Sequence, residues 1–457
     1  MNGIFLFSVI LKGIGAVLEV LLQILITRSI GVDGFGTYST WINTADIIFW
    51  VLFSALTKCN TFYLSVPNTS ISNFKKKYYG RYVLPVLIGL SFVMIFVGKT
   101  NYCIVLLITL LELSVLDQSS TLLAQNHQMI SLIGEYVFGR LVLVAGLLGL
   151  QAAGHLTQIS LMILYVIQYL GIMLVFALLS RSRRQKTVDI SDTVSLKKWR
   201  NYQRADLVQA MIGQMPVLLQ FFFSGAFEAG VVSVVLTVKK LINFISGPSA
   251  KVFLPEFSRL YQSGRQNEIR ACFASIMRIQ MLFAGPLSVV LLGYPHVILR
   301  ILADELVPYT SLFVMCSMVF LVVATFGPCS GVLQMTGNEK KDNMFREIAL
   351  AVMFVVMWLF RKDSLFVLYG LCIQAFLEGA GKFYYVCRWM KKAPVKLTTY
   401  LSWWLCPVIV IGVTYWRHWE DSIAWMMISA IIVFAIGMVS ELKKEGGLRD
   451  MFRKRTE

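Results

Sequence analysis

Long apolar segments separated by short polar stretches run along almost the whole chain of 457 residues. A transmembrane helix needs roughly 20 predominantly apolar residues, and by that rule the pattern predicts about 14 such helices. Strands of a membrane barrel are short and alternate in hydrophobicity, so we predict an all-α integral membrane protein. The predicted segments are 5–28, 38–66, 81–98, 102–124, 129–150, 156–180, 205–224, 229–250, 271–293, 309–334, 345–360, 364–388, 398–416 and 422–440.

The longest polar interruption, residues 181–203, leaves six segments before it, six after it and a final pair. We therefore predict an N-terminal six-helix lobe (1–180), a basic cytoplasmic linker (181–203), a C-terminal six-helix lobe (204–390), and a terminal helix pair with a basic cytoplasmic tail (391–457). A weak internal repeat supports this division, because LLQ at 21–23 and FGTYS at 35–39 parallel LLQ at 218–220 and AGVVS at 229–233. Both lobes would begin on the cytoplasmic side, as in parallel transporter repeats.

Composition and charge agree with a membrane location. The hydrophobic fraction is 57%, the charged fraction 15% and the mean hydropathy +0.69, which excludes a soluble domain. The formal charge is +17, with 29 Lys and Arg on one set of loops and tails and 6 on the other. This asymmetry predicts a multi-pass protein of the cytoplasmic (inner) membrane with both termini cytoplasmic. It also explains the charge without a nucleic-acid partner, and leaves anionic membrane lipids as a contact.

The first two segments carry polar and charged side chains along one face. At 3.6 residues per turn, Lys12, Glu19 and Gln23 of the first segment fall within about 60° of one another. Ionisable side chains cost several kcal/mol at the bilayer centre, so such a face is expected to line a bundle interior or a wet cavity. The residues concerned are Lys12, Glu19 and Gln23 on the first segment and Asn43, Asp46, Trp50 and Lys58 on the second.

The seventh and eighth segments repeat this feature with Gln220, Lys239 and Lys240. Because the first two segments of each lobe carry such polar residues, we predict a water-filled cavity that the two lobes share. The alternative for the uncharged residues is that they hydrogen-bond one another within a packed bundle. Arg28 is expected either to line the cavity or to extend to the outer interface.

Other polar residues indicate structural roles. Glu378 and Lys382, spaced i,i+4, predict a helical ion pair. Pro216 in the seventh segment frees backbone groups and favours a bend or a fixed kink.

Evidence for enzymatic chemistry is poor. The eight cysteines form no C-x-x-C pair, so we predict no metal site. The four histidines have no partner constellation, and GIGAVLEV at 13–20 is not followed by the Lys-Ser/Thr of a phosphate-binding loop. We therefore expect no catalytic residues and no bound cofactor.

The stretch LKGIGAVLEVLLQILITRSIGVDGFGTYS at 11–39 resembles the first helix and loop of polysaccharide and lipid-linked oligosaccharide exporters. These Wzx-type flippases share a superfamily with MATE drug exporters and lipid II flippases. The 14-segment, six-six-two layout extends the resemblance over the full chain, but AGVVS lacks the Tyr common in the family. The matching residues are Arg28, Ile30-Gly31, Asp33, Phe35-Gly36, Tyr38-Ser39, Pro255, Phe257-Ser258 and Gly264.

The resemblance implies a V-shaped, alternating-access carrier of two six-helix lobes plus a C-terminal helix pair. Its cargo would be an undecaprenyl-pyrophosphate-linked sugar repeat unit, moved to the outer leaflet for O-antigen or capsule synthesis. It further implies a polysaccharide polymerase and chain-length proteins as partners. In such a carrier Lys12, Lys58 and Lys240 would attract the pyrophosphate, Gln23, Asn43 and Gln220 would bond sugar hydroxyls, and Trp50 would stack on a sugar ring.

The sequence leaves the energy source and two competing functions open. The membrane potential would favour export of an anion, since a unit charge crossing 100 mV gains about 2.3 kcal/mol. Na⁺ or H⁺ coupling at Glu19 or Asp46 is the competing mechanism. A cation-coupled multidrug antiporter of the same fold is the alternative function, followed by a membrane-embedded polymerase or glycosyltransferase.

Overall fold

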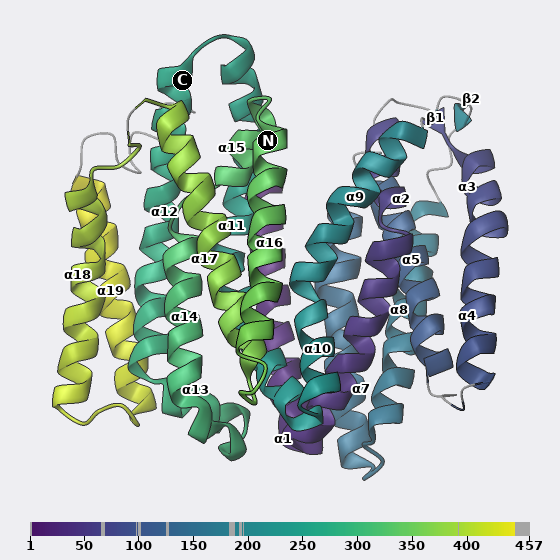
Figure 1. The fold of residues 1–457 in the computed structure, drawn as a ribbon, viewed down its shortest axis with the longest axis horizontal. Helices are drawn as coiled ribbons and strands as arrows, with labels where there is room; N and C mark the ends of the chain where they lie inside the picture. Colours follow the sequence, from purple (N-terminus) through teal and green to yellow (C-terminus); the bar gives the residue numbers. More distant parts are fainter. Residues whose placement is uncertain are drawn as a thin grey trace. The chain divides into compact units, whose positions relative to one another are not determined.

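The computed structural model describes residues 2–64, 69–96, 98, 102–124, 128–181, 188–191, 194, 196–391 and 393–443. Nearly all of them lie in helices, and the strands β1 (Thr69–Ser70) and β2 (Val188–Asp189) are two residues each (Figure 1). The prediction of an all-α membrane protein is confirmed. Contacts divide the chain into an N-terminal unit, Met1–Ser233, and a C-terminal unit, Val234–Glu457. The lobe boundaries drawn from the sequence stay a prediction.

The N-terminal unit is a bundle of long helices with several breaks. They are α1 (Asn2–Leu52), α2 (Ala55–Tyr63), α3 (Ser72–Tyr78), η1 (Tyr79–Val83), α4 (Leu84–Phe96), α5 (Tyr102–Ala124), α6 (Gln128–Leu132), η2 (Ile133–Phe138), α7 (Gly139–Ala152), α8 (Gln158–Arg181), α9 (Leu196–Gly213) and α10 (Met215–Phe223). The first eight residues of α11 (Ala226–Gln262) also belong to it.

Two breaks shape the first two predicted segments. Gly31 has φ 74° and ψ 170°, so α1 is two helices joined at a kink that only glycine adopts readily. The second break, between α1 and α2, is held by Gln203 of α9. Its amide nitrogen donates to the carbonyl of Trp50 at 2.8 Å and to that of Val51, and its oxygen accepts from the Ala55 N–H at 3.3 Å. Backbone groups freed within a membrane helix need such partners.

The break between α9 and α10 bends the chain by 43° at Gln214, beside Pro216. The bend predicted from this proline is confirmed. At one end of the unit β1 and β2 pair in parallel. Asp189 of β2 accepts hydrogen bonds from the backbone N–H of Asn73 in α3 at 3.0 Å and of Ser191 at 2.9 Å. The hydrogen bond from the Ser191 hydroxyl, followed by those from the backbone, lowers the pKa of Asp189 to about 2.

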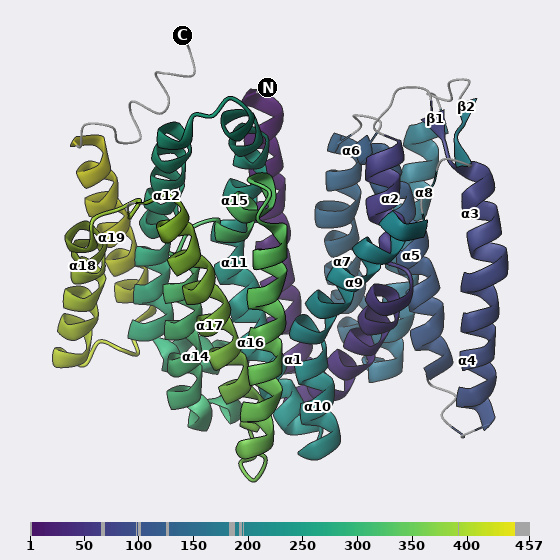
Figure 2. The same ribbon diagram turned by 45° about the horizontal axis from the view of Figure 1, so that its top comes forward.

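The C-terminal unit contains the rest of α11, followed by α12 (Gln266–Gly293), α13 (Pro295–Leu302), η4 (Asp304–Tyr309), α14 (Thr310–Ala324), α15 (Cys329–Met335), α16 (Glu339–Leu359), α17 (Phe366–Trp389), α18 (Leu397–Trp416) and α19 (Ile423–Lys443). The terminal hairpin α18–α19 packs on α12 (Figure 2). The core of the C-terminal unit includes Phe257 of α11 and Phe273 and Ile276 of α12, all fully buried.

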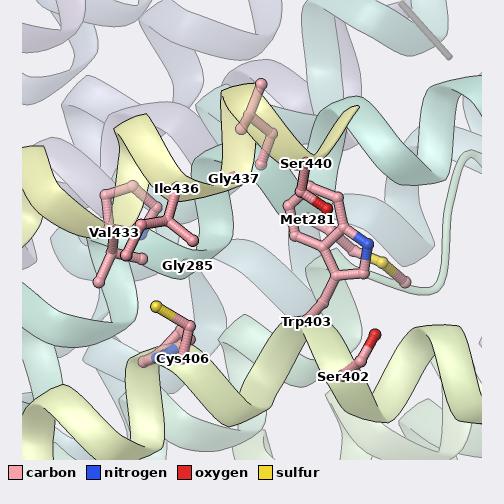
Figure 3. A pocket seen from close by; sticks show the side chains of 12 residues that line it. Met281, Gly285, Ser402, Trp403, Cys406, Val433, Ile436, Gly437 and Ser440 are labelled. Carbon is pink, nitrogen blue, oxygen red and sulfur yellow. The ribbon is translucent and has the colours of Figure 1, made fainter. Parts of the chain in front are cut away.

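A pocket of about 70 Å³ lies between α12, α18 and α19 (Figure 3). Trp403 and Cys406 line it from α18, and Gly437 and Ser440 from α19. Ligand pockets of drug-sized molecules are several times larger, at roughly 300–1,000 Å³. This pocket is too small for a sugar headgroup and is a packing feature of the terminal pair.

Within the described residues, nine helices are long and apolar enough to cross a membrane, or ten if the bent pair α9–α10 counts as one span. The span at Gly13–Leu52 runs across the Gly31 kink and so covers two predicted segments. A multi-pass membrane protein is confirmed, whereas the count of 14 stays a prediction.

Candidate functional site

Polar side chains from three elements of the N-terminal unit gather around Arg140, which lies near the middle of the apolar span Met129–Ala152. Its guanidinium Nη1 lies 2.9 Å from the Glu19 carboxylate of α1. The Glu19 carboxylate also accepts a long hydrogen bond, 3.5 Å, from the amide of Gln23. The site therefore contains an ion pair at mid-span. Glu19 was predicted as a site residue from the sequence, and Arg140 was not.

Three phenols complete this group, which we call the Arg140 cluster: Glu19, Gln23, Tyr38, Arg140, Tyr165 and Tyr169. The hydroxyls of all three tyrosines lie within electrostatic range of the guanidinium. The rings of Tyr38 and Tyr165 meet edge to face at 5.8 Å, and those of Tyr165 and Tyr169 at 6.3 Å. Such edge contacts fix the ring planes and hence the direction of the hydroxyls.

Close helix packing brings these side chains together. A Cβ on Gly139 would lie 2.8 Å from the amide nitrogen of Gln168, so α7 and α8 approach more closely than a larger residue allows. A Cβ on Gly15 would lie 2.8 Å from the carbonyl oxygen of Tyr136, which brings α1 equally close to η2. Small residues at helix contacts are the usual means of close approach in membrane bundles.

Two further carboxyl groups lie on α1 and α5 of the same unit. Asp46 accepts a hydrogen bond of 3.2 Å from the amide of Gln214. Glu112 lies on the α5 face that meets α1, since the Thr109 hydroxyl one turn earlier donates to the carbonyl of Ala45 at 3.4 Å. Asp46 and Glu112 interact electrostatically, and the Glu112 side chain is 8% exposed with a buried Oε2 that makes no hydrogen bond to any described residue.

The other residues predicted for the site, on α1, α2 and α10, do not belong to the Arg140 cluster as defined above. Asn43 donates to the carbonyl of Ser39 at 2.6 Å, and Trp50 packs edge to face on Phe49 at 5.5 Å. Gln220 is fully buried and Arg28 is exposed. The side chains of Lys12 and Lys58 lie outside the described residues.

Lys239 and Lys240 belong to the C-terminal unit. The Lys239 ammonium lies 5.2 Å from the centre of the Phe320 ring, a cation–π contact between α11 and α14. Among the described residues it makes no ion pair and no hydrogen bond, although Glu378 is within electrostatic range. Lys240, the next residue, is exposed.

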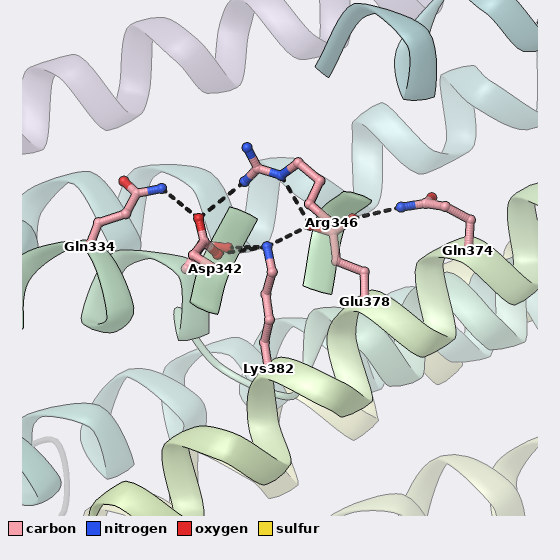
Figure 4. A network of polar contacts seen from close by, with 7 residues as sticks. Gln334, Asp342, Arg346, Gln374, Glu378 and Lys382 are labelled. Carbon is pink, nitrogen blue, oxygen red and sulfur yellow. Dashed lines mark hydrogen bonds and ion pairs between the residues drawn. The ribbon is translucent and has the colours of Figure 1, made fainter. Parts of the chain in front are cut away.

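A separate group of charges in this unit is internally satisfied (Figure 4). We call it the Lys382 network: Gln334, Asp342, Arg346, Gln374, Glu378 and Lys382. The Lys382 ammonium lies 2.7 Å from Asp342 and 2.6 Å from Glu378, which confirms the predicted i,i+4 pair. Arg346 lies 3.5 Å from Asp342 and 3.4 Å from Glu378. With two acids matched to two bases, the network stabilises the α15–α17 packing.

The fold defines a multi-pass helical membrane protein with a MATE-like architecture. Among solved structures, the chain is similar to lipid II flippase MurJ in an inward closed conformation. The TM-score is 0.70 at 14% identity, over 95% of this chain and 98% of that one.

The chain is also similar to an inward-facing multidrug resistance MATE family transporter of the MOP superfamily, with a TM-score of 0.61 at 12% identity over 83% of this chain and 94% of that one. A MATE protein in a bent conformation gives a TM-score of 0.59 at 10% identity over 85% of this chain and 95% of that one. No protein-family profile and no curated protein matches the chain. At these identities the likeness shows the fold alone, and that fold is the one shared by these transporters.

Proposed function

We propose that this protein is a flippase that moves an undecaprenyl-pyrophosphate-linked oligosaccharide repeat unit from the inner to the outer leaflet by alternating access. The resemblance at residues 11–39 and the fold shared with lipid II flippase support this proposal. The product would serve O-antigen or capsule synthesis, with a polymerase and chain-length proteins as partners. We place the protein in the cytoplasmic membrane with both termini inside.

The observation that carries the proposal is the state of Lys239. This ammonium lies in the predicted segment 229–250 against an aromatic ring, with no carboxylate at ion-pair distance among the described residues. An uncompensated charge within a membrane helix is expensive unless solvent or a ligand supplies the counter-charge. An anionic diphosphate headgroup supplies it, whereas a cationic drug does not.

The other predicted residues take roles that the cargo requires. In this proposal Lys12, Lys58 and Lys240 attract the diphosphate, while the amides Gln23, Asn43 and Gln220 hydrogen-bond sugar hydroxyls. Trp50 stacks on a sugar ring, as aromatic faces do on apolar sugar surfaces. The polyprenyl tail stays in the lipid.

We propose two sources of energy that experiment can separate. The membrane potential drives a doubly negative headgroup outward, at about 2.3 kcal/mol per charge per 100 mV. Na⁺ or H⁺ coupling would use Asp46, with Glu112 beside it, more readily than Glu19, which is held by Arg140.

The test is transfer of a defined lipid-linked sugar across proteoliposomes, with Lys239→Gln compared with Lys362→Gln, a change in an exposed turn. We expect the first to reduce transfer at least about tenfold, because it removes a charge-assisted contact, and the second to have no effect. Equal transfer by both variants would remove Lys239 as the support for the proposal. Collapse of the potential, and Asp46→Asn in a Na⁺ or pH gradient, then identify the energy source.

A cation-coupled drug antiporter is the second candidate. It is favoured by three carboxyl groups, Glu19, Asp46 and Glu112, that interact electrostatically with tyrosines of the Arg140 cluster and outnumber its one guanidinium. Transport of an organic cation, inhibited by Asp46→Asn and unaffected by Lys239→Gln, would support this alternative.

A further inference from the structure

Arg140 has more hydrogen-bonding capacity than the protein uses. A guanidinium carries five N–H donors in a planar fork. Among the described residues, its one ion pair or hydrogen bond is the contact between Nη1 and Glu19 at 2.9 Å. The Arg140 side chain is 29% exposed and that of Glu19 21%, so the pair is accessible from one side.

The accessible side must face water or a polar ligand. Arg140 lies near the middle of the span Met129–Ala152, where a charged group in contact with hydrocarbon costs several kcal/mol. A purely structural arginine would instead be satisfied on several nitrogens. Lys382 of the C-terminal unit, which is 3% exposed and contacts two carboxylates, provides that comparison.

The surroundings add donors at the same place. The phenols of Tyr38, Tyr165 and Tyr169 interact electrostatically with the guanidinium, and each carries a hydroxyl donor. Tyr38 and Tyr165 hydrogen-bond each other, so one of these two hydroxyls already donates within the pair. The chain just before Arg140 forms the π-helical turn η2, Ile133–Phe138, which changes the direction of the following residues relative to a regular helix. Such turns are frequent at functional sites.

We propose that Arg140 is an oxyanion-binding residue, with Glu19 as an internal counter-ion that the ligand displaces and the three phenols as additional donors. The inference rests on the proposed function and names Arg140 as a ligand of the cargo's diphosphate. A diphosphate presents paired oxygens that match the guanidinium fork, whereas the Glu19 carboxylate engages one nitrogen. The ligand therefore gains contacts that the resting pair lacks.

The neighbouring acids set the strength of this site. Glu19 competes directly for the guanidinium, and Asp46 interacts electrostatically with Tyr165 and Tyr169 of the same cluster. Binding of an anion is thus weak in the resting protein and strengthens when a neighbouring carboxylate is neutralised. Neutralising Arg140 should therefore weaken anion binding, whereas neutralising Glu19 should strengthen it. If the ion pair were only structural, loss of either residue would damage the protein.

The experiment measures binding of inorganic pyrophosphate to the full-length protein in nanodiscs by calorimetry, with Arg140→Gln, Arg140→Lys, Glu19→Gln and Arg417→Gln compared. Arg417 is exposed over the Trp416 ring and serves as the matched control. We expect Arg140→Gln to weaken binding at least about tenfold, Arg140→Lys to weaken it less, Glu19→Gln to tighten it, and the control to have no effect.

If Arg140→Gln does not fold, Glu19→Gln decides alone: tighter binding supports the inference, and unchanged or weaker binding overturns it. A parallel titration with glucuronate separates a diphosphate site from one for an acidic sugar, and preference for glucuronate overturns the assignment. Sugar-lipid transfer by the wild-type protein with pyrophosphate binding insensitive to Arg140→Gln would refute this inference and leave the proposed function standing. Pyrophosphate binding that depends on Arg140, in a protein that transfers no sugar-lipid, would support this inference and refute the proposed function.

Discussion

Removing the ammonium of Lys382 should destabilise the C-terminal unit far more than removing an exposed charge. In Lys382→Met the aliphatic stem is retained, but the contacts to Asp342 at 2.7 Å, to Glu378 at 2.6 Å and to the Ser330 hydroxyl at 2.9 Å are lost. The Asp342 side chain is 1% exposed and cannot regain these contacts from water. Breaking a buried pair from one side typically costs about 3–5 kcal/mol. We expect about 3 kcal/mol here, since Arg346 still lies 3.5 Å from Asp342.

The matched control is Arg300→Met, which breaks an ion pair to Asp421 at 3.7 Å whose side chains are 56% and 63% exposed. Such surface pairs contribute at most about 1 kcal/mol. The free energy of unfolding is measured by denaturant titration of the purified protein in detergent, followed by tryptophan fluorescence. The double variant Asp342→Leu with Lys382→Met should lose less than the sum of the two single variants, because it leaves no unpaired Asp342. Equal losses for Lys382→Met and Arg300→Met, or an additive double variant, would refute the reasoning.

Two further predictions concern backbone packing and pH. Gly36→Ala places a Cβ 1.7 Å from a backbone carbonyl oxygen of α11 and should cost at least about 1–3 kcal/mol in the same titration. Gly149→Ala meets nothing within 4 Å and should be neutral or stabilise by up to about 1 kcal/mol. The pKa of Asp189 is lowered to about 2 in the folded state, below its ordinary value of about 3.9, so its stabilising effect is present above pH 4 and lost as the pH falls towards 2. Hydrogen exchange of the Asn73 amide should accelerate over that window beyond its intrinsic pH dependence, and Asp189→Asn should remove the extra acceleration; retention of it would exclude Asp189 as the cause.

The bundle of apolar helices could be predicted from the sequence because each span is a local composition, readable one segment at a time. The bend at Pro216 was predictable for the same reason, as proline removes a backbone donor wherever it stands. The break after Leu52 was not, since neither Phe53 nor Ser54 disfavours a helix as proline does. It is stabilised by Gln203, about 150 residues further along the chain, and that contact exists only after folding.

The same distinction applies to the candidate site. Glu19 and Gln23 were found because they recur at helical spacing on one segment. Arg140 and Tyr169 were assigned no role because the few polar residues of their segments, such as Glu135 and Gln168, form no stripe at helical spacing. Only the close approach of α7 to α8, which Gly139 permits, places them together. An arginine in the middle of an apolar span was the available signal, because such a charge is expensive there and usually pairs or lines a cavity.

Charged residues within the helices therefore fall into two groups in this protein. In the Lys382 network two acids and two bases satisfy one another, so their loss should act on stability. Arg140 has one contact for five donors, and Lys239 has an aromatic ring in place of a carboxylate. Unused donors on Arg140 and an ammonium without an ion pair at Lys239 are what an anionic ligand would engage. Variants of these two residues should therefore act on ligand affinity while leaving the free energy of unfolding less affected than Lys382→Met does.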